Sequence, residues 1–200
     1  NEKKINWVSI EEQLKSVEHL IKAGKVKFFA LSNEWPWGLM EVIRLAKVKN
    51  LPLVCTLQNS YNLLNRIVEL GMTEIFFREN LSFFSYSPLA FGHLSGKYLK
   101  DPNAVGRVNL FPGYAQRYKR NGVNKAIEKY DALAKRRNIS LADLALSFVY
   151  KQWFVTSTVI GATNIKQLKQ NILAYDLDII DNELIEEIDE IHLQIMNPAP

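Results

Sequence analysis

Four short apolar segments alternate with amphipathic helical segments, and this alternation restricts the fold more than any other feature of the sequence. The apolar segments cover residues 26–31, 53–57, 81–86 and 156–160. Strands that alternate with helices are joined by right-handed crossovers, which place the strands in a parallel sheet. Continuous apolar runs are typical of strands covered on both faces. The sequence therefore predicts an α/β fold with about four parallel strands and surrounding helices.

Helix signals lie between and after these strands. Ser9 begins a capping box, in which its hydroxyl and the Glu12 carboxylate can satisfy each other's backbone amides. Such signals and the apolar periodicity predict helices over residues 9–24, 37–49, 63–79 with a break at Gly71, 122–137, 140–151 and 164–174, and from 181 onward. Residues 99–122 are rich in Pro, Gly, Asn and basic residues, so we expect a long surface loop there, a kind of segment that is commonly functional or mobile.

The number of strands bears on the architecture. A complete eight-stranded β/α barrel takes about 250 residues, whereas this chain has 200 residues and four candidate strands. We therefore expect a single domain over residues 1–200, built as half a barrel or as a small open sheet. The chain begins without a methionine, and we expect it to be a fragment of a longer protein or the product of a truncated gene.

Composition excludes several classes of protein. With 48% hydrophobic and 23% charged residues the chain is globular, and its net charge of +4 is too modest and scattered to predict nucleic-acid binding. The single cysteine, Cys55, permits no intrachain disulfide and fits a reducing, cytoplasmic compartment. No apolar segment reaches the length of a membrane span, and the first residues do not form a signal peptide.

Polar residues follow the predicted strands, and the carboxyl ends of parallel strands meet at one edge of a sheet. Ser32, Asn33 and Gln58 can exchange hydrogen bonds with a carboxamide, and the ring of Tyr86 can stack on a flat heterocycle. Residues 161–163 lead into a helix N-terminus, which favours a phosphate. Any one of these polar residues could instead serve only its local backbone. Taken together, they predict a nicotinamide dinucleotide site.

Residues 81–99 carry the most informative part of this pattern. A buried strand ends at Ser87-Pro88 in a loop of small residues that closes with Lys97, and Arg107 adds a second cation. Glycine loops let the backbone approach a ligand, and cations bind its phosphates. His19, His93 and His192 do not follow strands and are expected at the surface. No Cys/His cluster has the spacing of a metal site, so no metal is expected.

Ordered motifs make the sequence resemble a known family. They are Ser32-Asn33 after an apolar run, Gln58-Asn59 with Tyr61-Asn62, Tyr86-Ser87-Pro88-Leu89 with Gly96-Lys97-Tyr98, and residues 159–163 with Gln167 and Asn171. This set resembles the aldo-keto reductases across nearly all 200 residues, and most of all the branch related to potassium-channel β subunits. The resemblance implies a β/α (TIM) barrel that binds NADP(H) and passes hydride to carbonyl compounds, with this chain as its C-terminal half.

The resemblance also assigns the cofactor site. Under it, the nicotinamide contacts are Ser32, Asn33, Gln58 and Tyr86. The pyrophosphate path is lined by Ser87, Pro88, Leu89, Gly96 and Lys97. The adenosine end and its 2′-phosphate are bound by Arg107, Gly161, Thr163, Gln167, Gln170 and Asn171. The catalytic Asp, Tyr, Lys and His of the family lie on its first four strands, which would precede Asn1, so no catalytic residue is expected in this chain.

Two functions follow as hypotheses. The first is the cofactor-binding half of an NADP(H)-dependent oxidoreductase, which acts on a small carbonyl substrate once the barrel is complete. The alternative is a catalytically inactive, truncated barrel that serves as a binding module. In either case open sheet edges promote self-association or require a covering partner, such as the missing N-terminal half.

Overall fold

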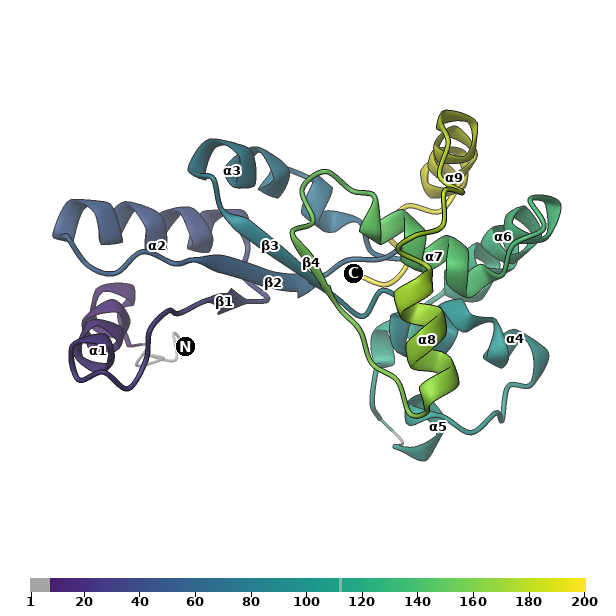
Figure 1. The fold of residues 1–200 in the computed structure, drawn as a ribbon, viewed down its shortest axis with the longest axis horizontal. Helices are drawn as coiled ribbons and strands as arrows, with labels where there is room; N and C mark the ends of the chain where they lie inside the picture. Colours follow the sequence, from purple (N-terminus) through teal and green to yellow (C-terminus); the bar gives the residue numbers. More distant parts are fainter. Residues whose placement is uncertain (1–7, 112) are drawn as a thin grey trace, which may run out of the picture.

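A computed structural model describes residues 8–111 and 113–200, and its centre is a parallel sheet (Figure 1). The four strands lie in the order β1-β2-β3-β4 and all pairs are parallel. They are β1 (Leu31–Ser32), β2 (Thr56–Ser60), β3 (Ser82–Tyr86) and β4 (Ser157–Val159). The predicted α/β fold with four parallel strands is confirmed.

Helices connect the strands in the predicted alternation. The longer ones are α1 (Ile10–Lys22), α2 (Pro36–Lys49), α3 (Met72–Glu79), α6 (Val123–Arg136), α7 (Leu141–Tyr150), α8 (Ile165–Leu173) and α9 (Asn182–Gln194). The short ones are η1 (Ile67–Glu69), η2 (Ala90–Ser95), α4 (Lys97–Lys100), α5 (Arg107–Leu110) and η3 (Gln116–Lys119). In Figure 1, α2 and α3 run along the sheet, whereas α6 to α9 gather beyond the ends of β1 and β2.

The core lies between the sheet and the helices that cover it. Leu57 of β2 and Phe83 of β3 are fully buried and occupy paired positions in the register. The Phe83 ring stacks on Phe76 of α3 at 4.9 Å between centroids, and Tyr61 stacks on Phe148 of α7 at 5.8 Å. Such aromatic contacts bury large areas and hold β2 and β3 rigidly against the helices. The carboxyl ends of these strands therefore form a firm edge for a site.

The first two strands differ from the predicted positions. β1 is confined to Leu31–Ser32, and β2 is displaced toward the polar residues that end at Ser60. Strand length depends on the neighbour as well as on apolar character, because each strand residue needs a hydrogen-bonding partner. β2 pairs with β3 up to Tyr86, so it extends past its apolar run, whereas Phe28 before β1 remains 75% exposed.

Residues 99–122, predicted as a surface loop, contain the end of α4, all of α5 and all of η3. Two side chains of this segment, Val108 and Tyr118, are buried and fasten it to the rest of the molecule. Over residues 8–111 and 113–200, no helix is both long enough and apolar enough to cross a membrane. In the same part of the chain, no three His, Cys, Asp or Glu side chains are grouped as metal ligands.

Candidate cofactor site

The ends of β1, β2 and β3 bring four of the predicted site residues together. Ser32 lies opposite Gln58 in the sheet, and the backbone amide of Asn33 donates to the Gln58 carbonyl at 3.0 Å. The Tyr86 hydroxyl donates to Asn33 Oδ1 at 2.5 Å, and Asn33 Nδ2 donates to Ser32 Oγ at 3.1 Å. Because β2 lies between β1 and β3, the bond from Tyr86 to Asn33 crosses the end of β2.

Local contacts hold the turn after β1 in this place. Asn33 has a left-handed backbone conformation, with φ of 57°, which asparagine tolerates better than most residues. Asn59 Nδ2 donates to the Glu34 carbonyl at 2.8 Å, and the Glu34 amide donates back to Asn59 Oδ1 at 3.2 Å. The Gln58 carboxamide has no hydrogen-bond partner among the described residues, so it remains free for a ligand.

The segment after β3 is a compact series of turns. Ser87 has φ of 58°, a conformation that is uncommon for a residue other than glycine, and Ala90 and Phe91 also have positive φ. Asn62, buried at the end of β2, donates to the Ser87 carbonyl at 3.0 Å and so fixes the path of this segment. Strained backbone of this kind is concentrated at functional sites. Asn62 was not among the predicted site residues, although it lies three positions after the strand-end residue Asn59.

Two cations flank the next part of this segment. Lys97 Nζ donates to the Val105 carbonyl at 3.2 Å and lies 4.8 Å from the centroid of the Tyr98 ring. The Arg107 guanidinium lies 5.8 Å from the centroid of the Phe91 ring. Among the described residues, neither cation pairs with a carboxylate. Their positive charge is therefore available to an anionic ligand.

The residues predicted for the adenosine end gather around the start of α8. The Thr163 amide and hydroxyl both donate to Gln167 Oε1 at 2.9 Å, and Asn171 Nδ2 donates to the Gly161 carbonyl at 3.1 Å. Gln170 points instead to α7, where its Nε2 donates to Asp143 Oδ1 at 3.1 Å. Helix α8 and η2 both pack against α7. The two parts of the predicted site are thus linked through one helix.

Histidine 93 lies in this region and is buried, contrary to the surface position expected from the sequence. Its side chain is 9% exposed and packs between the rings of Tyr98 and Tyr118, at 4.9 and 5.1 Å between centroids. Burial lowers the pKa of His93 to about 4, and the charge of Lys97 contributes to this shift. The imidazole is therefore neutral at pH 7. The rings of Tyr98 and Tyr118 shield the imidazole from water, and the sequence around His93 does not reveal that they pack there.

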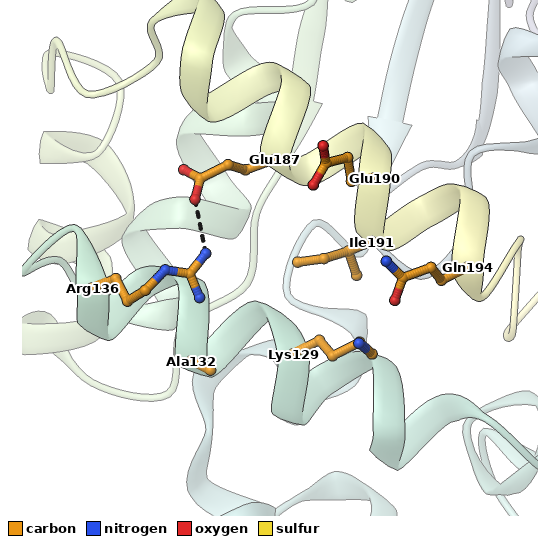
Figure 2. A pocket seen from close by; sticks show the side chains of 7 residues that line it. All are labelled: Lys129, Ala132, Arg136, Glu187, Glu190, Ile191 and Gln194. Carbon is orange, nitrogen blue, oxygen red and sulfur yellow. Dashed lines mark hydrogen bonds and ion pairs between the residues drawn. The ribbon is translucent and has the colours of Figure 1, made fainter.

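A groove of about 300 Å³ lies elsewhere, between α6 and α9 (Figure 2). It is lined by Lys129, Ala132, Arg136, Glu187, Glu190, Ile191 and Gln194. The Arg136 guanidinium donates to Glu187 Oε1 at 2.8 Å, so these two opposite charges neutralise each other. None of the predicted site residues lines this groove. The strand ends therefore remain the candidate site.

The fold and this site define the class of protein. It is an α/β protein whose parallel strands end in a rim of hydrogen-bonding side chains, the edge at which β/α barrels bind their ligands. The model of the aldo/keto reductase family matches residues 4–192, and the chain belongs to that family. The predicted architecture, part of a TIM barrel, follows from this membership.

Similar proteins agree with the family. Protein tas from Escherichia coli (strain K12) is 37% identical over 193 residues, covering 96% of this chain and 56% of that protein. An aldo-keto reductase from Babesia bovis is 36% identical over 200 residues, covering 96% of this chain and 70% of that protein. The L-glyceraldehyde 3-phosphate reductase of Escherichia coli (strain K12) is 28% identical over 186 residues, covering 90% of this chain and 54% of that protein. The chain thus spans little more than half the length of two of these relatives.

Proposed function

We propose that this chain is the cofactor-binding half of an NADP(H)-dependent oxidoreductase that transfers hydride between the cofactor and a carbonyl compound. The observation that carries the proposal is the linked set of Ser32, Asn33 and Tyr86 at the strand ends. Membership of the aldo/keto reductase family supports the reaction type. One relative is named for the reduction of L-glyceraldehyde 3-phosphate, which supports a small carbonyl compound as substrate.

The chemistry of the site residues fits a dinucleotide. The free carboxamide of Gln58 and the hydroxyl of Ser32 match a carboxamide that both donates and accepts hydrogen bonds. Tyr86 offers a ring for stacking, and its bond to Asn33 fixes that ring beside the amide groups. Lys97 and Arg107 would neutralise phosphates, and Arg107 would favour NADP(H) over NAD(H) through the 2′-phosphate.

In this proposal the chain binds and orients, and the rest of the barrel completes the chemistry. When bound, the nicotinamide supplies the hydride. Reduction leaves negative charge on the carbonyl oxygen, which needs a positioned acid. Tyr86 is committed to Asn33 as a hydrogen-bond donor, so we assign it to stacking and not to proton transfer. The acid would come from the N-terminal half, which would also complete the substrate pocket.

A second candidate function is a partner-binding module without catalysis. Its support is the exposure of large apolar side chains near the β1 edge, where Phe28 is 75% and Leu53 is 58% exposed. Such surfaces commonly lie in interfaces. In this reading the exposed edge binds the N-terminal half of a barrel, or a second copy of the chain, and cofactor binding is secondary.

The experiment that separates these functions uses the chain alone and the same chain joined to the N-terminal part of the tas protein. Binding of NADPH and NADH is measured by calorimetry, and NADPH oxidation is followed with aldehydes. The proposal expects tighter binding of NADPH than of NADH, with turnover only in the joined protein. If neither form binds NADPH although the two parts associate, the partner-binding function replaces it.

A further inference from the structure

The hydroxyl of Tyr98 is a buried donor with no partner in the described part of the chain. It lies against the backbone of Gly106: a Cβ atom at Gly106 would be 2.3 Å from Tyr98 Oη and also 2.3 Å from Lys97 Nζ. The two donors therefore reach the same point of the chain. One is a neutral hydroxyl and the other a cation.

The surroundings hold the Tyr98 ring firmly. The His93 ring lies 4.9 Å away between centroids, and a Cβ atom at Gly92 would lie 3.7 Å from Tyr98 Cε2. Lys97 Nζ lies over the Tyr98 ring, 4.8 Å from its centroid. His93 adds no positive charge, since it is neutral at pH 7. The Tyr98 hydroxyl thus lies beside the Lys97 ammonium group.

A buried hydroxyl without a partner is rare in folded proteins, because burial removes it from water without a replacement acceptor. Of the two donors, Lys97 Nζ has an acceptor, the Val105 carbonyl, to which it donates a hydrogen bond at 3.2 Å. A carbonyl oxygen beside an ammonium group occupies the place that an anionic oxygen would take. Residues 105–106 therefore cover a site with one cation, one free hydroxyl donor and a weak internal acceptor.

We propose that Tyr98 is a second donor of an anion site at Lys97, and that its hydroxyl binds a diphosphate oxygen when residues 105–106 move away. This inference rests on the proposed dinucleotide cofactor for the identity of the anion. It adds a ligand-binding residue beyond the lysine. The absence of a side chain at Gly106 lets this segment lie directly against both donors.

The test uses the 200-residue chain with two probes, inorganic pyrophosphate and NADPH, measured by calorimetry. Tyr98→Phe should weaken the binding of both probes about tenfold, the effect of losing one hydrogen bond to a charged group. The matched control is Tyr175→Phe, since Tyr175 is exposed and distant from Lys97 in the chain, and it should leave both affinities within about twofold. The thermal midpoint of unliganded Tyr98→Phe should not fall, because the hydroxyl has no partner to lose.

The outcomes separate the role of Tyr98 from the dinucleotide function. Unchanged affinity of Tyr98→Phe for both probes, or a lower thermal midpoint without ligand, overturns the role of Tyr98. Pyrophosphate binding that depends on Tyr98, without NADPH binding, supports the anion site and counts against the dinucleotide function. NADPH binding that Tyr98→Phe leaves unchanged supports the dinucleotide function and counts against the role of Tyr98. If the unmodified chain binds neither probe at millimolar concentrations, the anion site at Lys97 and Tyr98 is overturned, and NADPH binding by the joined protein decides the dinucleotide function separately.

Discussion

The Tyr86 hydroxyl and the Asn33 amide form the hydrogen bond on which the arrangement of the site most depends. From the sequence, only the ring of Tyr86 has a role, and Tyr86→Phe is expected to do little. The structure adds a positioning role for the hydroxyl, since it anchors Asn33, which in turn contacts Ser32. The two variants of Tyr86 therefore test different parts of its side chain.

We expect Tyr86→Phe to weaken NADPH binding by about two- to tenfold, the effect of one neutral hydrogen bond. Tyr86→Ala also loses base stacking, worth about 1–3 kcal/mol, so its affinity should be at least tenfold lower. Quenching of tryptophan fluorescence in the joined protein measures both. Normal NADPH affinity of Tyr86→Phe with complete loss of turnover would instead identify Tyr86 as the proton donor.

Arg107 is the second residue with a direct prediction. Its guanidinium packs near the Phe91 ring and has no carboxylate partner among the described residues. A hydrogen bond to a charged phosphate is worth about 1.5–3 kcal/mol, or roughly 10- to 100-fold in affinity. Arg107→Ala should therefore narrow the difference between NADPH and NADH affinities. Arg120→Ala, an exposed arginine of the same segment, is the control, and an equal ratio in both variants would remove Arg107 from the site.

His93 makes stability depend on pH. Its folded pKa of about 4 lies below the value of about 6.5 expected in the unfolded chain, so the unfolded state binds more protons between these values. The contribution of neutral His93 to the free energy of unfolding is therefore fully present above about pH 6.5 and is lost as the pH drops toward 4. His93→Gln should reduce this loss by roughly 1–2 kcal/mol, a figure discounted for partial access of water. Urea unfolding at pH 7 and pH 5 measures this loss of unfolding free energy. An equal loss in the unmodified protein and in His93→Gln would contradict the prediction.

At the scale of elements, side-chain caps determine where several helices begin. Ser140 Oγ accepts from the Asp143 amide at 3.1 Å, which makes it the N-cap of α7. Gln170 of α8 donates to the same hydroxyl at 3.3 Å, so the cap also connects α7 to α8. Because η2 and α8 both pack on α7, this helix supports two parts of the candidate site.

Ser140→Ala should lower the free energy of unfolding by about 1 kcal/mol, the usual effect of losing an N-cap. Ser16→Ala is the matched control, since Ser16 lies within α1 and bonds only to the Glu12 carbonyl. Alanine favours helix interiors, so this control should be neutral or slightly stabilising. Equilibrium unfolding in urea compares the two. An equal effect of both substitutions would show that the cap of α7 does not contribute to stability.

At the scale of the whole molecule, the described sheet has two open edges. β1 and β4 each pair with one neighbour in this part of the chain, and Phe28 lies exposed before β1. Four strands leave the rim of a β/α barrel incomplete, so a cofactor bound there would be open to water on one side. Water weakens the electrostatic stabilisation on which hydride transfer to a carbonyl depends.

We therefore expect the chain alone to show no carbonyl reduction, and the chain joined to the N-terminal part of the tas protein to show it. Oxidation of NADPH with a panel of aldehydes and quinones measures this. Sedimentation of the chain alone should also show association that increases with concentration, as exposed strand edges predict. Turnover by the chain alone on the order of 1 per second would mean that it contains a catalytic acid of its own.

The sequence alone determined what depends on neighbours along the chain. The hydroxyl of Ser9, the hydroxyl of Ser140 and the carboxylate of Asp181 cap helices where the local pattern predicted them, because capping joins residues three apart. The strand at 81–86 was equally clear from its apolar run, and the order of helices and strands was sufficient to predict a parallel sheet.

Only the tertiary structure decided what depends on residues distant in sequence. The limits of β1 and β2 follow from pairing between strands, and Tyr86 meets Asn33 across 53 positions of the chain. The burial of His93 depends on rings from residues 98 and 118 that pack against it. The spacing of apolar residues and the capping residues reflect interactions between residues that are close in the sequence. Pairing and burial arise when distant segments exclude water together, and no local pattern records which segments those are.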